Sequence, residues 1–149
     1  MRLHARLSTV ALVSGLVLGL ASCQQLAGSG KGKAEFTELR TQLAGTREAL
    51  RKAVGESDVT RVGALLPAVS SRLNEIEKRS SAMNMIDREH VALQIATARQ
   101  TITETDRWVA SGDLDSVRLK VNQIDVSLGE IDEILERTIR GSVEQSGSS

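Results

Sequence analysis

Apolar residues recur along most of this chain in alternating steps of three and four, the spacing that places them on one face of an α-helix. The clearest run lies in the last third of the chain, and an earlier run repeats its spacing. The later run consists of Leu114, Val117, Val121, Ile124, Leu128, Ile131 and Leu135, and the earlier one of Val59, Val62, Leu66, Val69, Leu73 and Ile76. Each run predicts an amphipathic helix whose apolar seam faces a shared core.

Two less regular runs predict two more helices. One carries Phe36, Leu39, Leu43, Leu50, Ala53 and Val54, and the other carries Val91, Ile95, Ala98, Ile102 and Val109, with Met83, Met85 and Ile86 ahead of it. Turn signals separate the helices, because Gly55 precedes Ser57 and Asp58, and Gly112 precedes Asp113. Short connections make successive helices antiparallel neighbours. Residues 34–140 are therefore predicted to form an all-α, antiparallel up-down four-helix bundle. One long hairpin that dimerises through its open face is the alternative.

The two halves of the predicted bundle correspond to each other at a constant offset. Asp58 matches Asp113, Val62 matches Val117, and the residues around Leu73 match those around Leu128. We call this correspondence the hairpin alignment. The turn at residues 55–58 coincides in it with the turn at residues 110–113. We interpret the domain as two helical hairpins, which an old duplication would explain.

Residues 1–23 follow a different pattern. Arg2 and Arg6 give a basic start, a mainly apolar run extends from Leu7 to Leu20, and Cys23 follows. A helix of that length is about 21 Å long, shorter than the roughly 30 Å hydrocarbon core of a bilayer. The run is therefore a poor permanent membrane span. It is typical of the apolar region of a cleaved signal peptide, which would comprise residues 1–22.

The sequence Leu20-Ala21-Ser22-Cys23 resembles the lipobox of bacterial lipoproteins at every position. This resemblance implies that signal peptidase recognises Leu20, Ala21 and Ser22, and that Cys23 carries a diacylglycerol and often a second acyl group on its new amine. Two or more acyl chains anchor a protein stably in a membrane. The resemblance covers residues 1–23 only. An ordinary signal peptide and an uncleaved anchor are the alternatives.

Two segments flank the predicted bundle. Residues 23–33 contain several glycines and no periodic apolar pattern, which predicts a lipidated flexible tether. Residues 141–149 are polar and glycine-containing, which predicts a disordered tail. Gln24 follows the cysteine, whereas in enterobacterial lipoproteins an Asp at that place favours retention in the inner membrane. The resemblance thus favours the outer membrane facing the periplasm, with the inner (plasma) membrane as the alternative.

The charge of the chain argues against nucleic-acid binding, and its cysteine content excludes an intramolecular disulfide. The chain has 19 basic and 19 acidic residues, and removal of residues 1–22 takes away Arg2 and Arg6 and no acid, so the mature net charge is about −2. Such a chain lacks the basic field that drives nucleic-acid binding. Cys23 is the single cysteine, so no intramolecular disulfide can form. Lipidation would explain why a secreted protein keeps one thiol.

Candidate chemistry is sparse. The mature chain has one histidine, His90, and no motif of a nucleophilic, zinc-dependent or phosphate-binding enzyme. We therefore expect no catalytic residues, no metal site and no enzyme activity. Met83 and Met85 near His90 resemble the Met/His axial pair of haem-binding bundles, although those ligands lie on facing helices. A solvated His90 beside methionines at the edge of the core is the favoured interpretation.

Trp108 stands alone beside the turn at residues 110–113. Burial at the end of the bundle is the favoured interpretation, and an exposed anchor for a partner is the alternative. The sequence as a whole predicts a lipid-anchored cell-envelope lipoprotein that acts as a non-enzymatic interaction or structural module and needs no cofactor beyond its lipid. The alternative is a periplasmic carrier of haem or another small ligand that uses His90, Met83 and Met85. We expect a membrane and an envelope protein as partners, or a second copy in a homodimer, and no nucleic acid.

Overall fold

The computed structural model describes the backbone of residues 21–146 and the side chains of residues 31–141, and over that range it contains helices and no strand. The elements in chain order are α1 (Ala21–Gly55), α2 (Val59–Arg79), the short 3₁₀ helix η1 (Ser80–Ala82), α3 (Met85–Ser111) and α4 (Leu114–Ser146). The prediction of an all-α fold with four main helices is confirmed.

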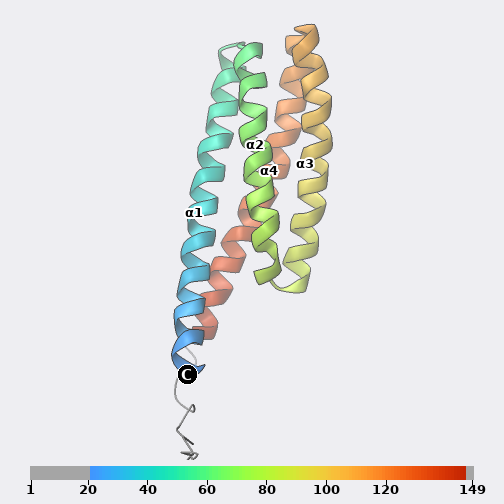
Figure 1. The fold of residues 1–149 in the computed structure, drawn as a ribbon. Helices are drawn as coiled ribbons and strands as arrows, with labels where there is room; N and C mark the ends of the chain where they lie inside the picture. The colour runs from blue at the N-terminus through green and yellow to red at the C-terminus, as the bar shows by residue number, and fades with distance from the viewer. Residues whose placement is uncertain (1–20, 147–149) are drawn as a thin grey trace, which may run out of the picture.

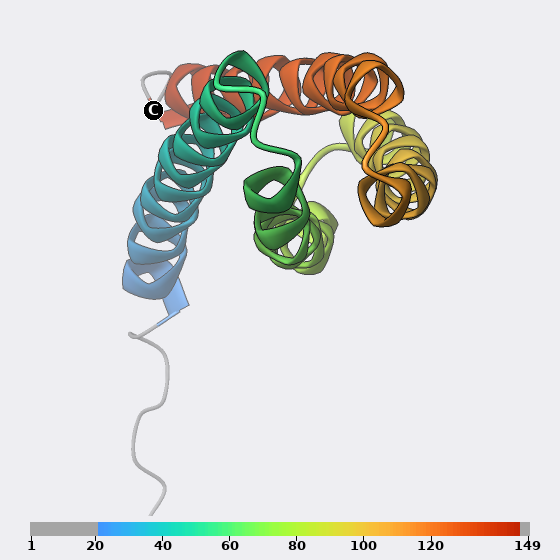
Figure 2. The same cartoon turned by 90° about the horizontal axis from the view of Figure 1, so that it is seen from above.

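The helices form an antiparallel bundle in which each one packs beside the next and α4 closes against α1. Figure 1 shows α1 and α4 extending together past the turn that joins α2 to α3. Viewed down the bundle, α1 and α3 occupy opposite sides, with α2 and α4 between them (Figure 2). Because α1 and α4 are the longest helices, the end of the bundle where α1 begins consists of these two helices alone.

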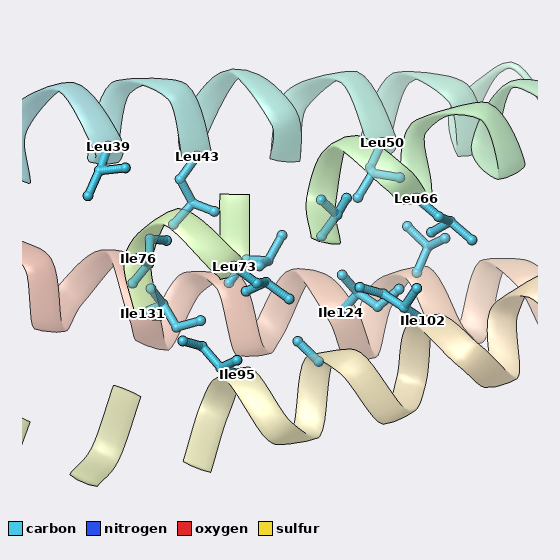
Figure 3. Packing of buried hydrophobic residues seen from close by; sticks show 14 of the residues in the cluster. Leu39, Leu43, Leu50, Leu66, Leu73, Ile76, Ile95, Ile102, Ile124 and Ile131 are labelled. Atoms are coloured by element: carbon cyan, nitrogen blue, oxygen red, sulfur yellow. The ribbon is translucent and has the colours of Figure 1, made fainter. Parts of the chain in front are cut away.

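Aliphatic seams from all four helices build the core (Figure 3). Every position of the earlier sequence run except Val59 is buried, and every position of the later run except Leu114 is buried. A few polar side chains join the core on α3 and α4, and Thr105 among them satisfies its hydroxyl by donating to the Thr101 carbonyl at 2.7 Å. Full burial of each Leu, Ile or Val contributes about 1.5–3 kcal/mol, so this core holds the four helices together.

The tips of the two hairpins have equivalent hydrogen bonds in the hairpin alignment. Asp58 caps α2 by accepting from the Arg61 amide at 2.9 Å, and Asp113 accepts from the Ser116 amide at 3.1 Å at the start of α4. The residue before each cap is left-handed, with φ of 58° at Ser57 and 71° at Gly112.

The backbone bonds that end α1 and α3 also coincide in this alignment. The amides of Asp58 and Asp113 donate to the carbonyls of Ala53 and Trp108, at 2.9 and 3.2 Å. These bonds satisfy carbonyls that a helix end would otherwise leave unpaired. The two hairpins are therefore structural equivalents at their tips, as the hairpin alignment predicts.

Both flanking segments differ from the prediction over the residues that the structure describes. Residues 23–33, predicted to be a flexible tether, lie within α1, and residues 141–146, predicted to be a disordered tail, lie within α4. An existing helix gains one hydrogen bond for each residue added, so it extends through glycine at a cost of about 1 kcal/mol each where no proline stops it. Gly141 does not adopt the left-handed conformation that ends α3 at Gly112. Residues 1–20, which include most of the predicted signal peptide, and residues 147–149 lie outside the described range.

Candidate functional site

The predicted lipidation site lies at the edge of the described chain. Leu20 is outside the described residues, and Ala21, Ser22 and Cys23 are the first residues of α1. A cut before Cys23 would remove only Ala21 and Ser22 from α1 and would leave the bundle whole. None of the helices described is both long and apolar enough to cross a membrane.

The structure separates the three residues considered for haem. Met83 is buried in the core, whereas Met85 is 64% exposed and His90 is exposed on α3. His90 borders a surface hollow that neither methionine lines. Within the described chain, these residues do not provide two ligands that face each other across a cavity. The interpretation of His90 as a solvated residue agrees with its exposure, but the expectation that both methionines lie at the edge of the core is wrong for Met85, which faces away from it.

The favoured interpretation of Trp108 as a buried residue is wrong. Its side chain is 40% exposed, and it lies on the α4 side of α3. The seam position at this height belongs to Val109, which packs against Gly63 of α2. Successive residues are rotated by about 100° around a helix, so Trp108 points out of the core beside Val109.

Two surface hollows lie along the α3–α4 hairpin. We call the first the His90 hollow, with a volume of about 600 Å³, and the second the Trp108 hollow, with a volume of about 410 Å³. The His90 hollow is lined by His90, Leu93, Gln94, Glu130, Ile134 and Arg137, and the Trp108 hollow by Glu104, Arg107, Trp108, Ser111 and Lys120. Leu93 and Trp108 lie about four helical turns apart on α3, so the hollows are about 22 Å apart along the bundle.

Ion pairs fix the register of α3 against α4 beside these hollows. Arg137 donates to Asp87 at 3.1 Å, and Lys120 donates to Glu104 at 2.5 Å. The separation along the chain from Asp87 to Glu104 equals that from Lys120 to Arg137. The two antiparallel helices therefore keep the same register at both ion pairs. The hydrogen bond from Lys120 holds the pKa of Glu104 below its usual value.

The Asp87 carboxylate also organises the start of α3. It accepts from the Asn84 side chain at 2.7 Å, while the Asn84 side-chain oxygen caps the helix by accepting from the Asp87 amide. Asp87 is buried. It therefore serves this cap and Arg137, and it shares no hydrogen bond with His90 in the described structure.

Large apolar side chains gather on the outer side of the same hairpin, a feature that the sequence analysis missed. We call the set the outer apolar stripe, and it comprises Ile86, Leu93, Trp108, Leu119 and Val126, with exposed fractions of 40% to 66%. Leu119, Val126, Glu130 and Arg137 follow steps of seven, four and seven, which place them on one side of α4. Because Glu130 and Arg137 line the His90 hollow, the stripe borders the groove between α3 and α4.

The first hairpin provides an internal comparison for this stripe. In the hairpin alignment, the counterparts of Ile86, Leu93, Leu119 and Val126 are Lys31, Glu38, Ala64 and Ser71, all of which are exposed. The hairpin fold therefore does not require large apolar residues at these positions. The alignment of the two halves was the sequence signal that could have identified the stripe.

The hollows of the two hairpins correspond as well. A hollow between α1 and α2 is lined by residues that include Glu35, Glu38, Glu75 and Arg79. An ion pair of 2.7 Å joins Glu35 to Arg79 across it. The counterparts of that pair in the second hairpin are His90 and Ile134. The second hairpin thus has no charged bridge at these positions, and its hollow is larger, about 600 Å³ against about 240 Å³.

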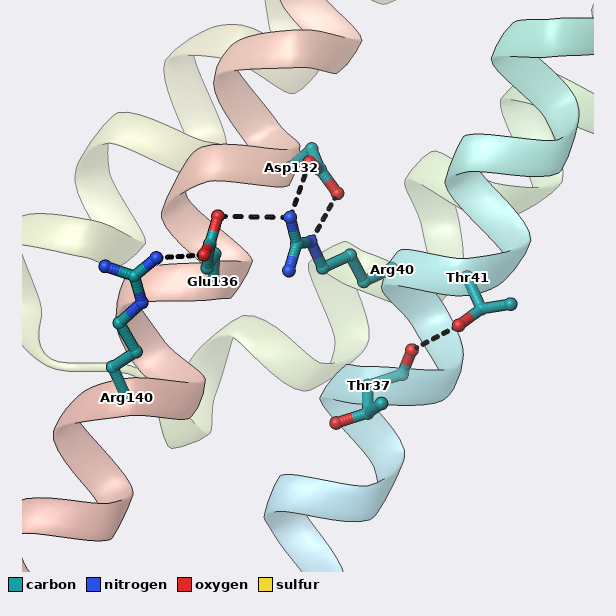
Figure 4. Close-up of polar contacts among 6 residues, drawn as sticks. All are labelled: Thr37, Arg40, Thr41, Asp132, Glu136 and Arg140. Atoms are coloured by element: carbon teal, nitrogen blue, oxygen red, sulfur yellow. Dashed lines mark hydrogen bonds and ion pairs between the residues drawn. The ribbon is translucent and has the colours of Figure 1, made fainter.

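A different set of ion pairs closes the bundle between α1 and α4. Arg40 donates to Asp132 at 2.8 Å and to Glu136 at 3.0 Å, and Arg140 also pairs with Glu136 (Figure 4). Farther along the same interface, Asp125 accepts from both Arg47 and Arg51. These groups are satisfied by one another, so this side of the bundle is a structural seam.

Comparisons with known protein families, curated proteins and solved structures found no match to this chain. Within the described residues, no group of three or more His, Cys, Asp or Glu side chains is placed to hold a metal ion. The candidate site consequently rests on geometry alone. It consists of the outer apolar stripe and the two hollows, at one side of the α3–α4 hairpin.

Proposed function

We propose that this protein is a lipid-anchored lipoprotein of a bacterial cell envelope whose helical bundle binds another protein and carries out no catalysis. The lipobox carries the proposal: the only cysteine follows a basic start, a short apolar run and the residues Leu20, Ala21 and Ser22. In this proposal the outer membrane facing the periplasm is the favoured location. Because α1 is helical from Ala21, the anchor would connect to the bundle through a helix rather than a loose tether.

The binding role is supported by the outer apolar stripe. Single exposed apolar residues are ordinary on protein surfaces, but a row beside two hollows is typical of interaction sites. Trp108 lies within this row, and tryptophan is among the residues that most often anchor protein interfaces.

Cys23→Ser tests the anchor. The unchanged protein should be cut before Cys23 and should fractionate with membranes, whereas the variant should lose both properties because serine offers no thiol to the lipid donor. Metabolic labelling with a palmitate analogue and fractionation provide the measurement, and Ser29→Ala is the matched control near the cleavage site. Processing and membrane association that persist in Cys23→Ser would contradict the proposal.

The binding role needs a separate test in cells. A photoreactive amino acid at Val126 should give a specific protein adduct, while the same group at the equivalent Ser71 should give none above background. Equal labelling from the two positions would remove the stripe as the reason for binding. This result is independent of whether Cys23 carries lipid.

A further inference from the structure

We propose that the groove between α3 and α4 binds an amphipathic helix of a partner protein, which lies along the bundle and places apolar side chains in the His90 and Trp108 hollows. This inference deepens the proposed binding function, on which it rests, by naming the chemistry of the partner. It is carried by the spacing of the outer apolar stripe, by the two hollows, and by the charged residues that line the hollows.

The spacing of the stripe fits a helix. Ile86 and Leu93 are one heptad apart on α3, and Leu119 and Val126 are one heptad apart on α4. These are the steps with which the helices of this bundle pack on one another. The hollows lie about 22 Å apart, close to two heptads of a helix, and a small ligand could not reach both.

The charges of the groove indicate what the helix should carry. Lys120 pairs with Glu104, and Arg137 pairs with Asp87. Among the charged residues that line the hollows, Arg107 then gives the Trp108 hollow a basic character and Glu130 gives the His90 hollow an acidic one. The partner helix should therefore have an acidic residue at one end of its apolar face and a basic residue at the other.

A second copy of this chain fits the groove poorly. If two copies stand side by side on one membrane about a two-fold axis along the bundle, α3 of one faces α4 of the other at equal height. The register set by Asp87 and Arg137 then brings Leu93 near Glu133 of the second copy, which would leave a carboxylate against an apolar side chain. A lipid surface is also disfavoured, because anionic headgroups would meet the exposed Glu130 and Glu133.

The single tryptophan makes the test direct, since Trp108 lies in the groove and the chain has no tyrosine. The full chain is titrated with a designed helical peptide of about 21 residues that lacks Trp and Tyr. The peptide has leucine at the core heptad positions, Glu at one end and Lys at the other, and a scrambled peptide of the same composition is the control. The chain is held in phosphatidylcholine vesicles if it carries lipid and in buffer if it does not, so the result is independent of the anchor.

We expect the designed peptide to shift Trp108 emission to shorter wavelengths in a saturable way and the scrambled peptide to cause no shift. Val126→Glu should raise the dissociation constant about tenfold or more, whereas Ser71→Glu, at the equivalent exposed position of the first hairpin, should change it less than about twofold. Circular dichroism checks that both variants keep the wild-type helix content and melting temperature. Leu93→Glu, which copies Glu38 of the first hairpin, provides a second disrupting variant if Val126→Glu does not fold.

Four results would overturn the inference. They are no shift at about 1 mM peptide, equal shifts from both peptides, equal weakening by Ser71→Glu, and a shift that the chain produces alone as its concentration or the content of anionic vesicles rises. The last result would assign the groove to a second copy or to lipid. None of these results would change the outcome of the lipidation test on Cys23, so failure of this inference and failure of the proposed anchor can be distinguished.

Discussion

Glycine at position 63 matters because two helices approach closely there. A Cβ at Gly63 of α2 would lie 2.7 Å from the Cγ1 of Val109 on α3, so the packing would have to shift. By contrast, nothing lies within 4 Å of a Cβ placed at Gly45 of α1. These two glycines therefore separate the effect of helix propensity from the effect of close packing.

Gly63→Ala should lower the free energy of unfolding by about 1–2 kcal/mol, because overpacking outweighs the gain in helix propensity. Gly45→Ala should raise it by about 0.5–1 kcal/mol, because alanine restricts the unfolded chain and meets no obstacle. Urea denaturation with an unchanged m-value measures both. A stabilising Gly63→Ala would show that the two helices separate there without cost.

Between elements, the hairpin tips use the same left-handed turn with different residues. Ser57 occupies it in the first hairpin and Gly112 in the second. A residue with a Cβ is strained at such φ values by about 1 kcal/mol, and glycine is not.

Ser57→Gly should therefore raise the free energy of unfolding by about 0.5–1 kcal/mol, and Gly112→Ala should lower it by about 1 kcal/mol. The opposite signs at equivalent positions are the expected outcome, and thermal unfolding followed by circular dichroism measures them. If both substitutions shift the midpoint in the same direction, backbone strain does not govern these turns.

At the scale of the helices, the sequence predicts the interior far better than the ends. The steps of three and four locate nearly all buried seam positions of α2 and α4, since burial of aliphatic residues leaves a direct mark on the pattern. The Asp caps are equally local, so Asp58 and Asp113 were predictable too. Helix ends without such a cap cannot be located from the sequence in this way. As a result, α1 begins before residue 34 and α4 ends after residue 140, the limits that the sequence predicts.

The candidate site was harder to predict because it depends on which residues the core leaves outside. The apolar runs include Val109 and leave out Leu93, Trp108 and Val126, so periodicity places these three side chains off the seams. Periodicity within each helix does not show which exposed residues of α3 and α4 lie on the same side of the bundle, because that depends on how the two helices pack.

For the whole molecule, ion-paired carboxylates at several contacts between helices make the free energy of unfolding depend on pH. Hydrogen bonding from Arg99 holds the pKa of Glu77 below its usual value between α2 and α3, and Lys120 does the same for Glu104 between α3 and α4. Burial acts to raise the pKa of Asp125, but Arg47 and Arg51 outweigh it, so this pKa is lowered as well. Groups with a lowered pKa in the folded state stabilise the protein once they are ionised.

The free energy of unfolding should accordingly be nearly constant above about pH 6 and should fall as the pH drops from about 5 through the lowered pKa values, because the unfolded chain then binds more protons.

Asp125→Asn should reduce the free energy of unfolding by about 1–2 kcal/mol at pH 7, since it leaves Arg47 and Arg51 without their shared carboxylate. The difference from the unchanged protein should shrink as the pH falls through the lowered pKa of Asp125, because the carboxylate then loses its charge. Urea unfolding across this range measures the effect, and Asp106→Asn at an exposed position is the control. A difference that does not change as the pH falls from 7 into the acid unfolding range would mean that Asp125 contributes through packing and not through its charge.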